Sequence, residues 1–334
     1  MKYKKTSLLF FLIILLTVFL FLCDLSFGSV NISFKVLWDV LTGKCEDESI
    51  RNIIITIRLN KTIVAFLAGA ALSVSGLQMQ TLFRNPLAGP YVLGISSGAS
   101  LGVALLILGT PWFGISVANM PLGIAGAAWI GSFIILVLIG VISRNIKDIM
   151  VVLILGMMFS SGVSAIVQIL QYLSHEEALK SFVVWTMGSL GEVTQSQLKI
   201  LSIAIIIGLV LAIITIKPLN LLLLGEEYAE TMGLNISKSR RLLFISTTLL
   251  AGTVTAFCGP IGFIGLAIPH VARMIFMNSD HRVLVPATII IGALILIFCD
   301  IISKLLVLPI NAITALLGIP IIIFIVLRAK NFAI

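Results

Sequence analysis

Residues 62–98 read TIVAFLAGAALSVSGLQMQTLFRNPLAGPYVLGISSG. The first part, 62–83, is mostly apolar and exceeds the roughly 20 residues that a helix needs to cross the hydrocarbon core of a bilayer. Pro86 and Pro90 follow it, and proline lacks the amide hydrogen that a continuing helix would use. A second apolar run then extends over 91–109. The stretch predicts two transmembrane helices joined by a short turn.

The remainder of the chain repeats this pattern, so we predict an all-α, polytopic membrane protein with about ten transmembrane helices. The predicted spans are 6–27, 62–83, 91–109, 120–142, 149–173, 197–217, 241–258, 261–277, 284–303 and 311–329. The segment 261–277 is the weakest, because prolines at its start and middle predict a short or broken helix. No linker separates the spans, which predicts one transmembrane domain over 1–334.

The composition excludes an ordinary soluble domain. Hydrophobic residues make up 59% of the chain, charged residues 11%, and the mean hydropathy is +1.18. Soluble domains carry roughly 25% charged residues on their surfaces. The net charge of +8 is better explained by basic cytoplasmic loops than by a nucleic-acid partner. The four cysteines have no zinc or redox spacing, so no metal or other cofactor is predicted.

The basic residues also predict the orientation of the chain. With alternating spans and an inner N-terminus, 14 of the 22 Lys and Arg residues fall on the inner side. Cytoplasmic loops are enriched in Lys and Arg, so both termini are expected in the cytoplasm. The first run, 6–27, resembles a signal peptide, but it is long for one and no cleavage site closely follows it. We therefore expect a retained first span.

The longest inner loop, 218–240, contains the sequence LLLLGEEYAETMGL at 221–234. Its two glycines bracket a short helix, and acidic residues occupy the first turn, where the helix dipole favours them. A helix this short is marginal alone, so something must hold it in place. It either lies on its own spans or docks a cytoplasmic partner, with Tyr228 and Met232 as anchors.

Two further patterns allow a chemical and a structural interpretation. Gly94, Gly98 and Gly102 recur every four residues, which predicts close helix packing, because the lysine of a phosphate-binding loop is absent. His270 and His281 flank Asp280, which suggests a metal site. A structural role is favoured, in which Asp280 and the neighbouring Arg282 cap helices and pair at the inner face.

Three strings, in this order and spacing, resemble the FecCD/BtuC-type permease family. They are RNPLAGPYVLGISSGAS at 84–100, LLLLGEEYAETMGL at 221–234, and GPIGFIGLAIPHVAR at 259–273 followed by DHR. The resemblance extends from about Arg58 to Leu327. It implies a BtuC-like type II fold and the membrane subunit of an ATP-driven importer of iron-siderophores, haem or cobalamin, in the bacterial plasma (inner) membrane. Such a subunit is not an enzyme.

The resemblance also implies partners and functional residues. The partners are a second copy of the chain, two cytoplasmic ABC ATPase subunits, an extracytoplasmic binding protein and a metal-chelate substrate. The implied ATPase-coupling residues are Leu224, Gly225, Glu226, Glu227, Tyr228, Ala229, Met232, Gly233 and Leu234. The residues implied to dock the binding protein are Arg58, Lys61 and Lys304. The structural motif positions are Arg84, Asn85, Pro86, Gly94, Gly98, Pro260, Gly262, Pro269, His270 and Arg273.

The translocation pathway is expected along the fifth span. The candidate lining residues are Gly156, Met157, Ser160, Ser161, Ser164 and Gln168. Each of them could equally serve only to pack helices. The chain departs from the family pattern at Asn60 and Lys61, where the family has Pro and Arg, and at Val307 and Asn311, where it has Glu and Gly. These departures put the outer docking contacts in doubt, because lysine lacks the bidentate fork of arginine.

Two other classes of function are weighed against an importer permease. An ion-coupled secondary transporter usually buries carboxylates near the bilayer centre, whereas Asp24, Asp148 and Asp300 fall near span ends. A membrane enzyme would need converging ligands, but the third histidine, His175, is predicted on the opposite side of the membrane from the other two. Activity of the isolated chain would support either rival, and a co-purifying ATPase would support the permease.

Overall fold

The computed structural model describes residues 2–28, 32–45, 47–109, 123–143, 146 and 148–329. These residues form helices joined by turns, without a strand. The elements up to residue 173 are α1 (Lys2–Ser26), α2 (Phe34–Leu41), α3 (Glu48–Asn52), η1 (Ile53–Arg58), α4 (Leu59–Leu82), α5 (Ile95–Ala104), η2 (Leu105–Gly109), α6 (Gly123–Ile142) and α7 (Ile149–Leu173). Those that follow are α8 (Glu176–Thr186), α9 (Gln195–Ile214), α10 (Ile216–Leu222), α11 (Glu226–Thr231), α12 (Ile236–Thr247), η6 (Thr248–Gly252), α13 (Thr253–Cys258), α14 (Ile264–Phe276), α15 (His281–Leu306) and α16 (Ile310–Ala329).

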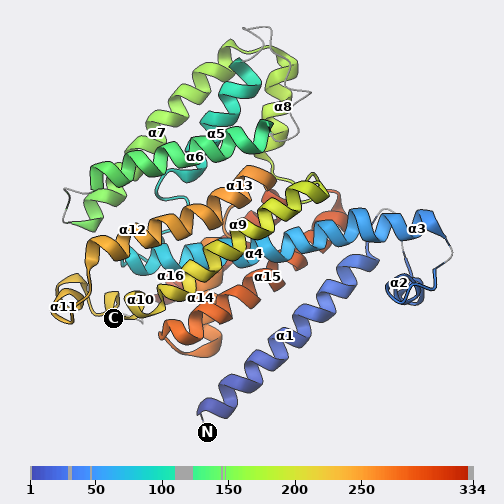
Figure 1. Cartoon of the computed structure of the whole chain (residues 1–334), viewed down its shortest axis with the longest axis horizontal. Helices are drawn as coiled ribbons and strands as arrows, with labels where there is room; N and C mark the ends of the chain where they lie inside the picture. The colour runs from blue at the N-terminus through green and yellow to red at the C-terminus, as the bar shows by residue number, and fades with distance from the viewer. Residues whose placement is uncertain are drawn as a thin grey trace.

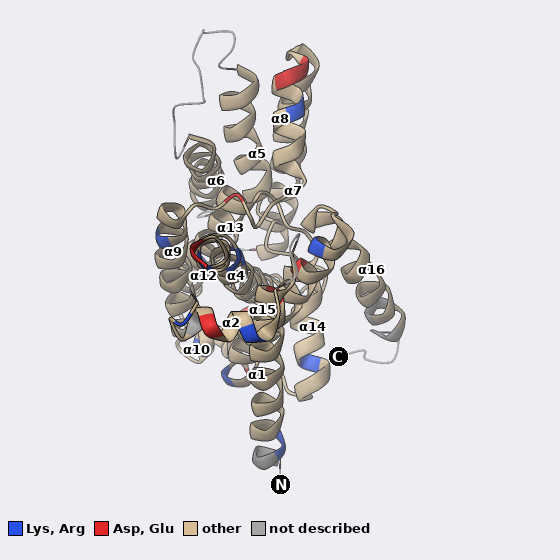
Figure 2. Ribbon diagram, turned by 90° about the vertical axis from the view of Figure 1, so that its right-hand side faces the viewer, with Lys and Arg blue, Asp and Glu red and all other residues tan. Residues whose placement is uncertain are grey.

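The ten predicted spans all correspond to apolar helices. Among the described residues, seven helical stretches are long and apolar enough to cross a membrane, and three shorter apolar helices accompany them. The shorter ones are Ile95–Gly109, Ile264–Phe276 and Ile310–Phe324. At 1.5 Å per residue, α14 rises only about 20 Å, which confirms the short helix expected in the eighth span. Figure 2 shows that most of the ribbon carries no charge.

Two helices, α4 and α15, form the centre of the molecule, with α5–α8 grouped on one side and α1 at the edge (Figure 1). The backbones of α4 and α15 approach so closely that a Cβ on Gly69 of α4 would strike the carbonyl of Gly292 on α15. Gly98 of α5 and Gly131 of α6 meet in the same way. In lipid, such small-residue contacts replace the hydrophobic effect as the basis of helix association. The small residues of the second span are thus explained by packing.

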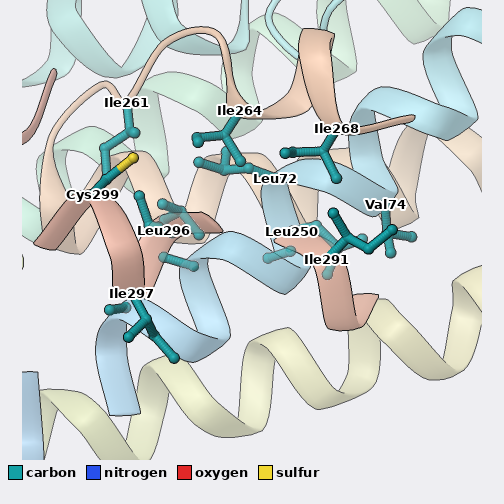
Figure 3. Packing of buried hydrophobic residues seen from close by; sticks show 14 of the residues in the cluster. Leu72, Val74, Leu250, Ile261, Ile264, Ile268, Ile291, Leu296, Ile297 and Cys299 are labelled. Atoms are coloured by element: carbon teal, nitrogen blue, oxygen red, sulfur yellow. The ribbon is translucent and has the colours of Figure 1, made fainter. Parts of the chain in front are cut away.

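Buried apolar side chains fill the space around these contacts. Figure 3 shows Leu72 and Val74 of α4 beside Ile264 and Ile268 of α14 and Ile291 of α15, all in one cluster. These five side chains are at most 3% exposed. By contrast, most of the side chains of α7 and α9 are not buried within the chain. The two central helices are therefore enclosed by protein, and the outer helices offer their apolar surfaces to lipid or to other subunits.

Helix boundaries differ from the prediction where a cap decides them. The seventh span begins at Ile236 rather than 241, because the Asn235 side chain accepts a hydrogen bond of 2.9 Å from the Lys238 amide. The third span begins at Ile95 rather than 91, because Gly94 adopts a left-handed conformation with φ 77°. Gly94 is thus the N-cap of α5, and it also packs closely, since a Cβ there would lie 2.9 Å from the Ser160 hydroxyl on α7. The start of the predicted span 120–142 lies outside the described residues.

Candidate functional site

The loop between α9 and α12 carries the short helix predicted from its two glycines. Gly225 precedes α11 with φ 104°, and Gly233 follows it with φ 86°. The amide of Leu234 donates to the carbonyl of Ala229 at 2.9 Å and closes the last turn. Both glycines occupy backbone conformations that other residues avoid. The sequence therefore fixes the start and end of α11.

One side of α11 is buried against the rest of the chain, and the other side is exposed. Ala229 is fully buried, whereas the side chains of Tyr228 and Met232 are 69% and 61% exposed. Leu224, just before the helix, is also exposed. Large apolar side chains in such a cluster are typical of a protein contact. The two interpretations left open by the sequence are therefore compatible, because α11 lies on its own spans and still presents an apolar face.

Asn220 ties this loop to the start of α15. Its side chain donates to Asp280 Oδ1 at 2.7 Å and accepts from the His281 backbone amide at 2.8 Å. The two ring nitrogens of His281 lie 2.8 Å from Asn220 Oδ1 and 2.9 Å from Thr81 Oγ1. His281 is therefore a buried structural residue. In the part of the chain that the structure describes, no group of three or more metal-ligating side chains occurs.

The expectation for Asp280 is half correct. Asp280 caps α15 by accepting the backbone amide of Arg282 at 2.8 Å, and this hydrogen bond holds the pKa of the carboxyl group below its usual value. The predicted side-chain ion pair with Arg282 is not among those of the described residues. The oxygen that caps α15, Asp280 Oδ1, also accepts from the Asn220 side chain of α10 at 2.7 Å.

The proline-rich turn after α4 packs against the segment around α14. His270 Nε2 lies 2.7 Å from the carbonyl oxygen of Pro86, and Arg273 donates to Gln80 at 2.8 Å. The Tyr91 hydroxyl donates to the carbonyl of Ile261 at 3.1 Å. Two of the three family strings thus meet through hydrogen bonds between residues about 170 to 190 positions apart.

The other motif positions are also accounted for. Asn85 accepts the Leu87 amide at 2.9 Å and shapes the turn, where Arg84 has φ 47°. The Gly262 amide donates to the side chain of Asn311 at 3.0 Å. Pro260 lies in the non-helical segment before α14, and Pro269 lies within that helix. Asn311, one of the departures from the family pattern, therefore supports the broken segment before the eighth span.

A cavity of about 490 Å³ opens between this turn and α7. Four serine hydroxyls line it, from Ser96 and Ser97 at the start of α5 and from Ser160 and Ser161 on α7. Met157 and Leu266 add apolar surface, and no charged side chain lines the cavity. Ser96 and Ser97 were not among the predicted pathway residues, which all lie on the fifth span.

The six predicted pathway residues divide into three groups. Met157, Ser160 and Ser161 line the cavity. Ser164 and Gln168 are exposed further along α7, on the helix face that also carries Ser161. Gly156 is buried, and a Cβ there would lie 2.7 Å from the Val92 carbonyl. Gly156 therefore serves helix packing, which was the alternative interpretation for this residue.

Two lysines and two aspartates form a network at the place where α1 and α15 end and α4 begins. Lys304 Nζ lies 2.7 Å from Asp24 Oδ1 and 2.9 Å from Asp300 Oδ2, and Lys61 Nζ lies 3.0 Å from Asp300 Oδ1. Arg58 donates to the last carbonyls of α1, at Leu25 and Ser26. The three cations assigned to docking are therefore brought together, but each has partners within the chain. Their docking role stays a prediction.

Asn60 belongs to the same region. Its side-chain amide donates to the carbonyl of Val193 in the segment before α9, and the residue is buried. The departure from the family's proline at this position thus adds a hydrogen bond that proline could not make. The neighbouring Thr62 donates to Asp24 Oδ2 at 2.5 Å.

We expect Lys304→Met to destabilise the protein by about 3 kcal/mol or more, because it leaves two buried aspartates facing each other. The side chain of Lys304 is only 9% exposed, so water cannot replace it. Thermal unfolding in detergent measures the loss, with Lys199→Met, at an exposed position on α9, as the control. Adding Asp300→Asn to Lys304→Met should recover part of the loss. Equal unfolding temperatures for Lys304→Met and the control would contradict this account.

The apolar helices of the described residues, the exposed short helix α11 and the hydroxyl-lined cavity define a multi-pass membrane permease. The chain belongs to the FecCD transport family, whose sequence model matches residues 15–328. It is 37% identical to the hemin transport system permease protein HmuU of Yersinia pestis, over 99% of this chain and 98% of that protein. It is 39% identical to the vitamin B12 import system permease protein BtuC of Klebsiella pneumoniae, over 82% of each chain.

A solved structure agrees with these sequence comparisons. It is an inward-facing conformation of a transporter described as metal-chelate type ABC, with a TM-score of 0.85, 30% identity, and coverage of 96% of this chain and 99% of the other. The chain is therefore a permease subunit of an ABC importer and a multi-pass inner-membrane protein. ATP hydrolysis belongs to separate subunits, which confirms that this chain is not an enzyme.

Proposed function

We propose that two copies of this chain form the pathway for an iron chelate, either a siderophore complex or haem, with cobalamin as the alternative substrate. Two ABC ATPase subunits bind the cytoplasmic face and move α11. The exposed apolar face of α11, with Leu224, Tyr228 and Met232, is the observation that carries this proposal. Both termini lie in the cytoplasm, as the excess of Lys and Arg on that side indicates.

The chemistry of the cavity supports a chelate as the cargo. Serine hydroxyls and apolar side chains line it without a charged group, so a chelate that hides its metal would interact weakly and could leave again. The full-length likeness to a hemin permease supports an iron-containing cargo. The cavity and the exposed side of α7 are assigned to the pathway, with the second copy completing the wall.

The extracytoplasmic binding protein is assigned to the outer ends of α1, α4 and α15. The network of two lysines and two aspartates there is joined by the nearby Arg58, so the region has a net positive charge that would attract an acidic surface. Lys61 retains 22% of its side-chain exposure and is the cation best placed for direct contact. Arg58 and Lys304 would act mainly by holding the helix ends and by adding charge.

Reconstitution in proteoliposomes tests the proposed function. The chain, its co-expressed ATPase and its binding protein should take up an iron-siderophore or haem only when ATP is present on the ATPase side. Cobalamin serves as the alternative cargo in a parallel assay. Uptake by the chain alone, driven by a proton or sodium gradient, would overturn the proposal in favour of a secondary transporter.

Within the pathway, Ser161→Trp is expected to reduce uptake at least tenfold, because the indole would fill the cavity beside α7. Binding of the ATPase subunits should be unaffected, since Ser161 lies on α7 and the proposed ATPase contact lies on α11. The matched control is Ile166→Trp, at an exposed position on another face of the same helix. Initial rates of labelled-chelate uptake make the comparison. Equal rates for the two variants would exclude this cavity from the pathway.

A further inference from the structure

The guanidinium group of Arg240 on α12 forms a bidentate ion pair with a glutamate of α11. Its Nε lies 3.2 Å from Glu226 Oε1, and its terminal NH2 nitrogen lies 2.6 Å from Glu226 Oε2. A bidentate pair of this kind fixes both distance and orientation, which a single lysine contact cannot do. Glu226 is the first residue of α11. The pair therefore fixes the beginning of the exposed inner helix.

The other terminal nitrogen of the same guanidinium binds a third segment. Arg240 NH1 donates to the carbonyl oxygen of Ile146 at 3.1 Å. Ile146 lies in the connection between α6 and α7, three residues before α7 begins at Ile149. Asp148 caps that helix by accepting the Met150 amide at 2.8 Å. One side chain thus joins α11 to the start of the helix that lines the cavity.

Burial makes this junction stiff. Arg240 is 9% exposed, and apolar side chains from both segments surround the site. Ile146 and Ile149 on one side share a hydrophobic cluster with Leu222 and Leu243 on the other. Hydrogen bonds to a buried guanidinium are costly to break, because the guanidinium itself would be left without partners or water. A displacement of α11 would therefore be passed through Arg240 to Ile146, three residues before α7.

The geometry points to Arg240 as a positioning residue that transmits the movement of α11 to α7 and so couples ATP hydrolysis to the pathway. This inference rests on the proposed function, because it requires α11 to be moved by an ATPase. Arg240 contacts α11 through the Glu226 carboxylate, and it contacts the segment before α7 through the Ile146 carbonyl. Without Arg240, the ATPase could still bind and hydrolyse ATP, but α7 would no longer move with α11.

The simpler alternative is that Arg240 only stabilises the fold of the loop. Three variants separate the two roles in the reconstituted complex. Arg240→Met removes both connections, Arg240→Lys keeps the charge but cannot hold both partners, and Glu226→Gln weakens the ion pair while leaving the Ile146 bond. Arg241→Met is the matched control, because Arg241 is the adjacent arginine on α12 and is exposed.

The measured quantity is the number of chelate molecules imported per ATP hydrolysed. We expect this ratio to fall at least tenfold in Arg240→Met and about threefold in Glu226→Gln, with Arg240→Lys between them and Arg241→Met unchanged. A pure folding role would lower the amount of assembled complex and leave the ratio intact. An unchanged ratio in Arg240→Met would overturn the inference.

A measurement of the distance between α11 and α7 tests their connection through Arg240 without a transport assay. Spin labels at Thr231 on α11 and Met150 on α7, in a background without native cysteines, should give one narrow distance distribution. Arg240→Met should broaden it, whereas Arg241→Met should not. Equal widths for the two variants would contradict the connection. Absence of ATP-driven uptake in the unmodified complex would overturn the proposed function instead, and the distance result would still stand.

Discussion

Gly76→Ala is expected to prevent accumulation of folded protein. Gly76 lies on α4 where that helix crosses α14, and an added Cβ would fall onto the carbonyl oxygen of Gly265, far inside contact distance. The obstruction is backbone on both sides, so no side chain can rotate away. Overpacking usually costs about 1 to 3 kcal/mol when side chains can adjust. Separating two central helices should exceed that range.

Fluorescence-detected size-exclusion chromatography of detergent extracts measures the effect. The variant should yield little monodisperse protein. Gly126→Ala in α6 makes the same change in another apolar helix, but the added carbon meets no atom within 4 Å, so its yield should match the unmodified protein. A normal yield and unfolding temperature for Gly76→Ala would show that the helices can separate at this crossing at little cost.

The spans could be predicted because the bilayer imposes one length on every apolar run. The prediction for α7, 149–173, agrees with the observed helix Ile149–Leu173 at both ends. Asp148 before it and Ser174 after it mark the ends of that apolar run. Where polar residues continue a helix beyond the membrane, hydropathy gives no such signal. The second span is therefore part of a continuous helix over Glu48–Leu82.

Short helices outside the apolar runs could not be predicted in the same way. The connection between α1 and α4 contains α2, whose Leu37 and Val40 pack against Leu25 of α1. The amphipathic pattern of an eight-residue helix is brief, and its partners lie elsewhere in the chain. The same reason applies to α8. Such helices depend on tertiary contacts more than on their own propensity.

Within the candidate site, local signals were predictable and distant ones were not. The two glycines around α11 impose backbone conformations that can be inferred from the sequence alone. The partners of Arg240 and Asn220 could not be inferred, because Ile146 and His281 lie 94 and 61 residues away from them. Likewise, the family resemblance implied a docking role for three cations, while the pairing of Lys61 and Lys304 with Asp24 and Asp300 required the fold.

The double variant Tyr228→Ala with Met232→Ala is expected to release the ATPase subunits and to abolish uptake. Both side chains are largely exposed on α11, one helical turn apart, and no other part of the described chain covers them. Buried aromatic anchors at protein interfaces are worth about 2 kcal/mol or more each, which is roughly a 30-fold change in affinity. Loss of two neighbouring anchors should therefore lower ATPase affinity by at least that factor.

Co-purification of the ATPase with tagged permease measures the loss, and ATP-driven uptake measures its consequence. The fold should survive, because exposed side chains contribute little to the stability of α11, whereas Ala229 beneath them stays buried. Tyr172→Ala is the matched control for co-purification of the ATPase, since Tyr172 is 89% exposed near the C-terminal end of α7. If the double variant retained both its ATPase and its uptake, α11 could not be the element that the motor subunits hold. The work of transport would then have to enter the chain elsewhere, since permeases of this family do not hydrolyse ATP themselves.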